Sequence, residues 1–172
     1  ESFRAVVLSA TDPASPYGSL VKWPASAWGD EISLLQGHDP NASSDGGRGP
    51  TRTGGALVIV VDGYAGAYLR RGERELLLFM PPAEPTRSHA TQAVARALVQ
   101  LSAAREEGRR GLLLAEIDGL PASIHPAARL FVNEGFLPTA MGLQLRHVSR
   151  DSGFGIRDSE SQDDDGDTPA PG

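Results

Sequence analysis

The chain has 172 residues, of which 40% are hydrophobic, 16 are basic and 22 are acidic. This length supports one folded domain with a hydrophobic core and is too short for two domains of ordinary size. Because the sequence contains no cysteine, disulfide scaffolds, zinc sites with thiolate ligands and cysteine nucleophiles are excluded.

The formal net charge of −6 is concentrated at one end of the chain. Residues 151–172 hold seven acidic residues and one arginine, whereas residues 1–150 carry equal numbers of each sign. This acidic tail is rich in Ser, Asp, Gly and Pro, a composition typical of disordered chain. No apolar run reaches the roughly 20 residues of a membrane span and the N-terminus lacks a signal-peptide pattern. We therefore expect a cytoplasmic protein that does not bind membranes.

The first third of the chain is predicted to be mostly irregular. Residues 3–9 form an apolar run that favours a β-strand. Pro and Gly residues punctuate the chain from there to position 29, and they favour turns and extended structure. Residues 37–55 are dominated by Gly, Pro, Ser, Asn and Asp, which predicts a long flexible loop. We assign residues 1–36 to an N-terminal strand with an irregular segment, followed by the loop at 37–55.

A regular β-structure is predicted to begin at residue 56. Residues 56–61 are apolar and mostly β-branched, as expected for a strand covered on both faces. The Asp62-Gly63 pair tolerates the positive φ of a type I′ turn, and residues 64–70 are predicted to return as a second strand. Another tight turn at residues 71–73 leads to a third strand over 74–80. The sequence therefore predicts a three-stranded meander.

The remainder is predicted to alternate helices and strands. Apolar residues between positions 88 and 107 recur with a 3.6-residue period, which indicates an amphipathic helix. The further predicted elements are a strand over 112–117, a short helix over 126–135, and closing strands at 136–137 and 143–148. The element order predicts an α+β domain with a mostly antiparallel sheet and two helices, with its core over 56–150 and a disordered acidic tail over 151–172.

Residue types that commonly carry chemistry lack catalytic or metal-binding spacing here. The four histidines show no paired spacing, and a metal site needs three or four convergent ligands. The chain has no nucleophile elbow, phosphate-loop lysine or dinucleotide fingerprint. Asp62 and Asp118 could do acid–base work if they met in a cleft, but each precedes a glycine, so turn chemistry explains both. We predict no catalytic residue, no metal and no cofactor in this segment.

One group of residues suggests binding of nucleic acid. Arg70, Arg71 and Arg74 form the densest basic cluster of the ordered part, and Tyr17 and Trp23 are candidate stacking aromatics. Guanidinium groups pair with phosphates, and aromatic rings stack on the bases of single strands. The alternative is a hairpin with a solvated basic turn and aromatic side chains that pack against their own domain.

Three stretches of the chain together form a recognisable pattern. Residues 10–24 read ATDPASPYGSLVKWP, residues 52–69 contain RTGGALV, VDG and YL, and residues 134–146 read EGFLPTAMGLQLR. In order and spacing, these stretches resemble motifs near the C-terminal end of the large helicase-related, or Lhr-type, proteins. The resemblance covers most of residues 5–147.

The resemblance implies a long ATP-dependent 3′–5′ DNA helicase, acting in DNA repair, whose RecA-like domains use ATP and Mg²⁺. This segment contains no phosphate loop, D-E-x-H box or arginine finger, so it is expected to be a non-catalytic accessory domain. Its expected partners are single-stranded DNA or a DNA/RNA hybrid, together with other domains of the parent protein. The alternative is a docking module that binds no ligand and uses the exposed edge of its sheet.

The predicted element order also resembles the later half of GNAT-type acetyltransferases, in which a G-F pair follows the last long helix, here Gly135-Phe136. Those enzymes hold the pyrophosphate of coenzyme A on backbone amides of a Q/R-x-x-G-x-G/A loop at a helix N-terminus. Residues 80–87 occupy that place and contain three prolines and no glycine. The prolines remove amide donors, so only a degenerate GNAT-like fold stays open as an alternative.

Overall fold

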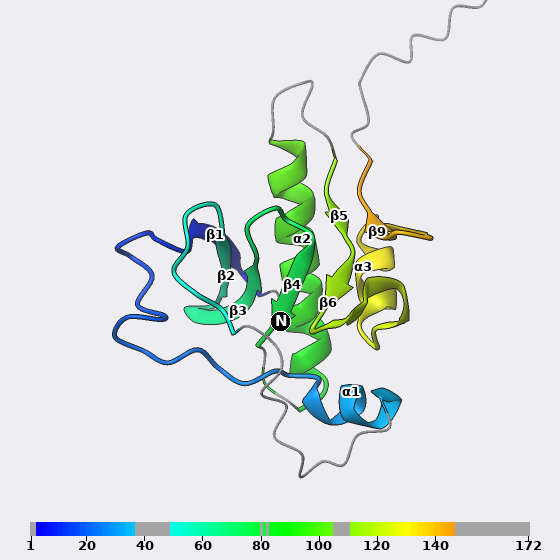
Figure 1. Ribbon diagram of the computed structural model, residues 1–172, viewed down its shortest axis with the longest axis horizontal. Helices are drawn as coiled ribbons and strands as arrows, with labels where there is room; N and C mark the ends of the chain where they lie inside the picture. Colours follow the sequence, from blue (N-terminus) through cyan, green and yellow to red (C-terminus); the bar gives the residue numbers. More distant parts are fainter. Residues whose placement is uncertain (1–2, 37–48, 80, 82, 105–110, 147–172) are drawn as a thin grey trace, which may run out of the picture.

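The computed structural model describes residues 3–36, 49–79, 81, 83–104 and 111–146. In chain order its elements are β1 (Ala5–Ser9), α1 (Gly29–Gln36), β2 (Leu57–Val61), β3 (Tyr64–Leu69), β4 (Glu75–Leu78), α2 (Thr86–Ala103), β5 (Leu113–Leu114), β6 (Glu116–Ile117), β7 (Leu120–Pro121), the 3-10 turn η1 (Ala122–Ile124), α3 (Ala128–Asn133), β8 (Leu137–Thr139) and β9 (Gly142–Gln144) (Figure 1). The α+β class is confirmed. The acidic tail and most of the predicted loop at 37–55 lie outside the described residues, and the division at positions 36, 55 and 150 stays a prediction.

The larger sheet has the strand order β1-β2-β3-β4-β6-β7 and contains the predicted meander. All its pairs are antiparallel except β4 with β6, which are parallel. The two Asp-Gly turns have the backbone that the sequence predicts, because Asp62 and Gly63 have φ of 47° and 88° and Asp118 and Gly119 have φ of 50° and 80°.

The predicted strand over residues 112–117 is not one strand, and this corrects the sequence interpretation. Its first part, β5, pairs with β9 in a separate sheet of order β5-β9-β8, whereas its second part, β6, pairs with β4. The division lies at Ala115, where the backbone N–H groups of Ala115 and Glu116 both donate to the carbonyl oxygen of Arg74 (2.8 and 3.1 Å). Because one acceptor serves two successive donors, the regular hydrogen-bond ladder between this segment and β4 is interrupted at Ala115. The chain therefore pairs with the small sheet before this point and with β4 after it.

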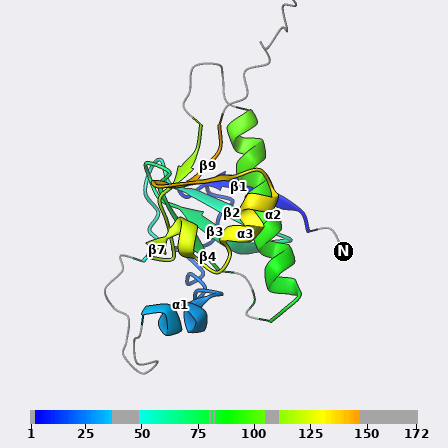
Figure 2. The ribbon, with the colours of Figure 1, turned by 90° about the vertical axis from the view of Figure 1, so that its right-hand side faces the viewer.

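The long helix α2 covers one face of the larger sheet (Figure 2). Its buried positions follow the 3.6-residue period, and the largest of them are Val94 and Leu98, both fully buried. They pack with alternate residues of the strands, including Ile59, Leu69 and Leu78. The predicted second helix is α3, which contacts α2, η1 and β9. This face holds the main core of the protein.

The opposite face of the sheet is covered by chain without regular structure. Residues 10–23 cross it, and Tyr17 and Trp23 pack there with Tyr68 and Phe79 in an aromatic cluster. The strand residues that point to this face alternate with those facing α2, as the two-residue period of a strand requires. The irregular N-terminal segment is therefore an integral layer of the fold.

The helix α1 was not predicted from the sequence. In α1 the residues that pack against the core are Ile32 and, just before the helix, Trp28, whereas Leu34 and Leu35 are exposed. With so few buried positions its sequence, GDEISLLQ, carries no clear amphipathic period. The helix is held by contacts with residues distant in the sequence, including the ion pair between Glu31 and Arg87 of α2, and periodicity does not report such contacts.

Candidate nucleic-acid interface

The predicted basic cluster lies on the tight turn between β3 and β4. Gly72 and Glu73 both have positive φ, 92° and 60°, and the turn is closed by hydrogen bonds from the N–H of Glu73 to the Arg70 carbonyl and from the N–H of Arg70 to the Glu75 carbonyl (both 2.9 Å). A turn this short fixes the backbone positions of the residues that flank it. The sequence thus places its arginines on a well-defined hairpin end.

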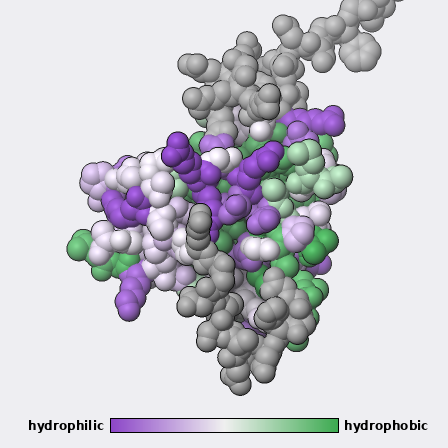
Figure 3. Space-filling view, viewed as in Figure 1, coloured by the Kyte–Doolittle hydropathy of each residue, from purple (hydrophilic) through white to green (hydrophobic). Residues whose placement is uncertain are grey.

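The three arginines of the hairpin differ in surroundings. The Nε of Arg70 lies 2.7 Å from a carboxylate oxygen of Glu75, and its side chain is 22% exposed. Arg71 and Arg74 are exposed, and the side chain of Arg71 passes over Gly55, where a Cβ would come within 3.3 Å of its Cγ. Hydrophilic side chains gather at the centre of this face of the molecule, over the β3–β4 turn (Figure 3). Arg71 and Arg74 are therefore the cations best placed to meet a ligand.

A cleft of about 780 Å³ opens beside this turn, between the two sheets. Its lining residues, which we call the arginine cleft, are Gly72, Glu73, Arg74, Gly111, Leu112, Leu113, Met141, Gln144, Leu145 and Arg146. Arg74 enters from the large sheet and Arg146 from the end of β9. The N–H of Leu145 donates to the carbonyl of Leu112 (2.8 Å), and this bond brings Arg146 to the cleft. Two guanidinium groups on a groove with an apolar floor suit a phosphate-bearing chain.

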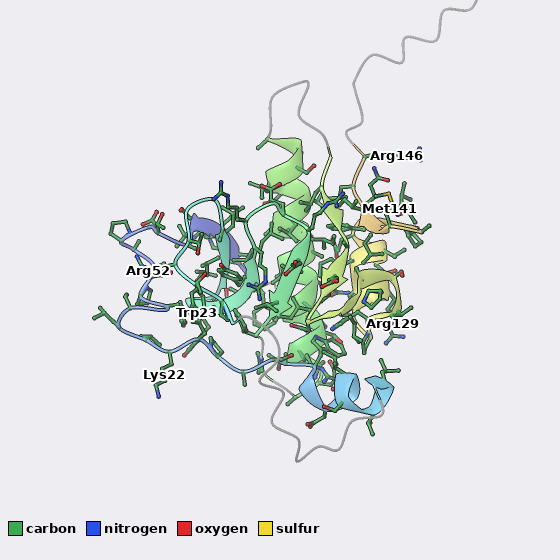
Figure 4. The ribbon with its side chains drawn as sticks, in the orientation of Figure 1. Lys22, Trp23, Arg52, Arg129, Met141 and Arg146 are labelled. Carbon is green, nitrogen blue, oxygen red and sulfur yellow. The ribbon has the colours of Figure 1, made fainter. Side chains whose placement is uncertain are left out.

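Sequence reasoning missed Arg146. It lies far along the chain from the hairpin, and only the pairing of β5 with β9 places it near Arg74. Figure 4 shows Arg146 beside Met141 at this edge of the molecule. The one available signal was its position within the last predicted strand, in the stretch GLQLR.

Tyr17 and Trp23 lie in the aromatic cluster, away from the arginine cleft. Tyr17 is 9% exposed, stacks on Trp23 with ring centroids 5.8 Å apart, and accepts a hydrogen bond at its hydroxyl from the N–H of Ala65 (2.9 Å). Trp23 is half-buried and lines a second depression of about 590 Å³ together with Lys22 and Arg52. In Figure 4 these three labelled residues lie on the side of the molecule opposite Met141 and Arg146. The five predicted residues therefore fall into two separate groups.

Arg52 holds the second group together from inside. Its two terminal nitrogens donate to the carbonyl oxygens of Thr11, Asp12, Ser15 and Tyr17, and to the Ser19 hydroxyl, at 2.6 to 3.4 Å. This guanidinium links several backbone carbonyl groups of the irregular segment to one another. Its N–H donors are therefore used within the protein. Of the cations around this depression, Lys22 is the exposed one.

The turn interpretation of Asp62 and Asp118 is confirmed. Asp62 accepts a hydrogen bond from the N–H of Arg4 (2.9 Å) across the start of the β2–β3 turn. One oxygen of Asp118 accepts from the N–H of Leu78 (2.9 Å), and the other lies 3.2 Å from Nε2 of the buried His125. The backbone of each aspartate forms the expected turn, and each carboxylate joins that turn to a neighbouring segment of the chain.

The tautomer of His125 follows from its neighbours. Its Nδ1 accepts the N–H of Ala127 (3.1 Å), so in the neutral ring Nε2 carries the proton and donates it to Asp118. The side chains of His125 and Asp118 are 0% and 5% exposed. A pair so enclosed joins β4 to the turn before α3 and has no access to a substrate.

The N-terminus of α2 is occupied by a side chain of the protein. The Glu84 carboxylate accepts the N–H of Ser88 (3.1 Å) and pairs with Nε of Arg87 (3.0 Å). These bonds, from Ser88 first and then Arg87, hold the pKa of the Glu84 carboxyl below its ordinary value. A carboxylate placed here repels a pyrophosphate, which is a second reason, besides the prolines, against acetyltransferase chemistry.

Metal-ligating side chains do not converge within the described residues. In those ranges no three His, Cys, Asp or Glu residues approach one another as ligands would. The same part of the chain holds no helix with the length and apolar character needed to cross a membrane.

Comparison with known proteins places the chain among long relatives. No family model matches it. It is 37% identical over 153 residues to "Lhr helicase/ probable uracil glycosylase" of Mycolicibacterium smegmatis and 30% identical over 141 residues to "Lhr helicase/uracil glycosylase" of Escherichia coli. The alignments cover 84% and 82% of this chain but 8% of each relative. The resemblance carried by the sequence motifs is thereby confirmed, and the chain is related to a small segment of the Lhr-type helicases.

Proposed function

We propose that this chain is a non-catalytic accessory segment of an Lhr-type helicase and that it binds single-stranded nucleic acid at the arginine cleft. The observation that carries the proposal is that Arg74 and Arg146, which flank strands of two different sheets, line one cleft beside the exposed Arg71. The relatives supply the helicase context by name. The chain has no phosphate loop of its own, so ATP and Mg²⁺ belong to other parts of the parent protein.

The chemistry of the cleft suits the backbone of a nucleic acid strand. A guanidinium group forms paired hydrogen bonds to phosphate oxygens, and each phosphate neutralised releases counterions. The contacts of Arg71 and Arg74 are independent of base sequence, so they serve a protein that moves along a strand. The charge of Arg70 is largely offset by its ion pair with Glu75, so Arg71, Arg74 and Arg146 are the groups that we assign to phosphate contacts.

We place a secondary contact at Trp23. Its ring is half-buried and lies beside the exposed Lys22, which can pair with a phosphate while a base meets the open part of the indole. Tyr17 supports this contact from beneath, because its ring stacks on Trp23 and its hydroxyl is held by Ala65.

Docking to another protein is the second candidate, and one observation favours it. Leu20 is 90% exposed and Val21 is 46% exposed, side by side on the irregular segment. Exposed aliphatic side chains of this kind suit contact with another domain. A hydrolytic role, which the second half of the relatives' names raises, gains no support from Asp118 and His125, since both are buried and hydrogen-bonded.

The experiment is a binding titration of a fluorescently labelled single-stranded oligonucleotide at low and at moderate salt. It uses the full chain and, because acidic residues repel phosphates, a variant with Asp163, Asp164, Asp165 and Asp167 all changed to Asn. Micromolar or tighter binding that weakens steeply with salt supports the proposal. No binding by either protein at low salt overturns it and leaves the docking module.

Matched charge reversals locate the interface. Arg74→Glu is expected to weaken binding several-fold and to reduce the salt slope by about one. Arg129→Glu makes the same charge change at an exposed position on α3 and is expected to leave affinity nearly unchanged. Equal losses in the two variants, with both folded by circular dichroism, would show that the cleft is not the binding surface.

A further inference from the structure

We propose that the acidic tail, residues 151–172, binds the arginine cleft of its own chain and competes there with nucleic acid. The proposed competition rests on the function proposed above. The proposed contact between tail and cleft does not, because it is supported by their opposite charges and by the attachment of the tail beside the cleft. The tail would act as a built-in regulator that sets the affinity of the cleft according to salt and to the length of the competing strand.

Charge complementarity is the first support. The tail holds a net charge of −6, whereas residues 1–150 are neutral as a whole. Four of its carboxylates, at positions 163, 164, 165 and 167, fall within five residues. Aspartates in such a run offer guanidinium groups the same kind of oxygen acceptors that phosphates offer. The exposed Arg71, with Arg74 and Arg146, is the matching cationic surface.

The place of attachment is the second support. Arg146 is the last described residue before the tail, and it lines the cleft itself. The first acidic residue, Asp151, follows five residues later, within an extended reach of about 17 Å. Asp163 follows 17 residues after Arg146, and Gly- and Ser-rich linkers of that length span roughly 20–25 Å on average. Linkers of this length give a tethered group an effective concentration of about a millimolar.

The other charges at the cleft set the strength of the contact. Glu73 lines the same cleft, and Glu75 is paired with Arg70 at its margin, so the tail meets some repulsion. Exposed ion pairs are individually weak and are screened by salt. The contact is therefore expected to be reversible, so that a long strand with many phosphates can displace the tail.

A distance measurement tests the contact without any nucleic acid. The chain contains no cysteine, so Ser161→Cys introduces a single attachment point for a nitroxide spin label in the middle of the tail. We expect paramagnetic broadening of the amide signals of Gly72, Arg74 and Arg146 at low salt, and its loss in 0.5 M NaCl. The matched control carries the same label with Asp163, Asp164, Asp165 and Asp167 changed to Asn, and it should show little broadening.

Absence of broadening at low salt, or equal broadening in the Asn variant, overturns the contact. A second measurement tests competition with the labelled oligonucleotide. The variant with the four Asp→Asn substitutions is expected to bind the oligonucleotide several-fold more tightly than the unsubstituted chain at low salt. This difference in affinity should narrow as salt rises. It should also be smaller when both proteins carry Arg74→Glu. Broadening without any oligonucleotide binding would keep the contact while overturning both competition and the proposed function. Binding that is indifferent to the Asn substitutions overturns competition alone.

Discussion

The two faces of the large sheet are closed in different ways. On one face, α2 lays Ala, Val and Leu side chains against aliphatic strand residues such as Ile59 and Leu78. On the other, an irregular segment places Tyr17 and Trp23 over Tyr68. A helix satisfies its own backbone hydrogen bonds, so the first face needs only apolar burial. The irregular segment satisfies only part of its backbone in its own turns, as where the N–H of Ser15 donates to the carbonyl of Asp12. The second face therefore also depends on polar side chains that come from elsewhere in the chain.

Two of these polar contacts come from the stretch that precedes β2. Arg52 satisfies four carbonyl groups of the irregular segment, and the hydroxyl of Tyr68 donates to the carbonyl of Thr51 (2.8 Å). Buried carbonyl groups without partners are costly, so these bonds decide whether the segment can lie on the sheet. The two faces should therefore respond differently to substitution.

The largest expected effect is on the helix face. Leu98→Ala removes a fully buried side chain from the middle of α2, and we expect a loss of about 2–5 kcal/mol in the free energy of unfolding, from lost burial and the remaining cavity. Urea unfolding followed by circular dichroism measures it. Gln100→Ala, at an exposed position on the same helix, is the control and should change stability by less than about 0.5 kcal/mol. A loss below 1 kcal/mol for Leu98→Ala would show that this face can repack.

The next effect is on the aromatic face. Arg52→Met keeps an aliphatic stem but removes all its donors, and we expect a loss of about 1.5–3 kcal/mol, because the carbonyl groups of Ser15 and its neighbours lose a charged partner. Amide hydrogen exchange should accelerate first at residues 14–21 and leave α2 protected. Lys22→Met is the matched control, since Lys22 is exposed on the same segment. Equal acceleration in α2 would mean that the two faces unfold as one unit.

The same contrast explains what the sequence could predict. The meander, the turns at Asp62 and Asp118 and the helix α2 follow from local patterns, namely apolar runs, Asp-Gly pairs and a 3.6-residue period. The role of Arg52 does not follow from a local pattern, because its acceptors are more than 30 residues away in the sequence. This holds even though Arg52 lies in one of the motifs shared with the Lhr-type family. The prediction of one continuous strand over residues 112–117 failed at Ala115 for a similar reason, since the shared acceptor at Arg74 is set by tertiary structure.

The residues of the candidate site also divide into those that local sequence patterns predict and those that only the fold brings together. The hairpin arginines could be found from the sequence because they are neighbours in it, and Arg71 and Arg74 are indeed exposed on one turn. Trp23 and Tyr17 were grouped with them by residue type, yet the structure gives them a packing partner in each other. Arg146 reaches the cleft through strand pairing across the small sheet. Local clustering thus predicts the hairpin, and only the fold shows which distant residues join it.

The smallest expected effect lies at the N-terminus of α2, where this helix meets α1. There Arg87 bonds to Glu84 and Glu31, and its guanidinium carbon lies 4.0 Å from the ring centroid of Trp28, so it ties α1 to α2. The hydrogen bonds from Ser88 and Arg87 lower the pKa of Glu84 in the folded protein, so the carboxylate form is the one that folding favours. Its contribution is therefore complete above the ordinary value of about 4.5 and is lost as the pH falls through the lowered folded value.

Glu84→Gln should remove this acid-dependent part of the stability. Because the Glu84 side chain is 46% exposed and screened by solvent, we expect less than about 0.5 kcal/mol at neutral pH, with the curves of variant and parent converging as the pH falls below the folded pKa. Thermal unfolding between pH 2 and pH 7 measures both curves. If Glu84→Gln lowered stability equally at every pH, the lost interaction would be packing of the helix end, and the carboxylate charge would play no part in joining α1 to α2.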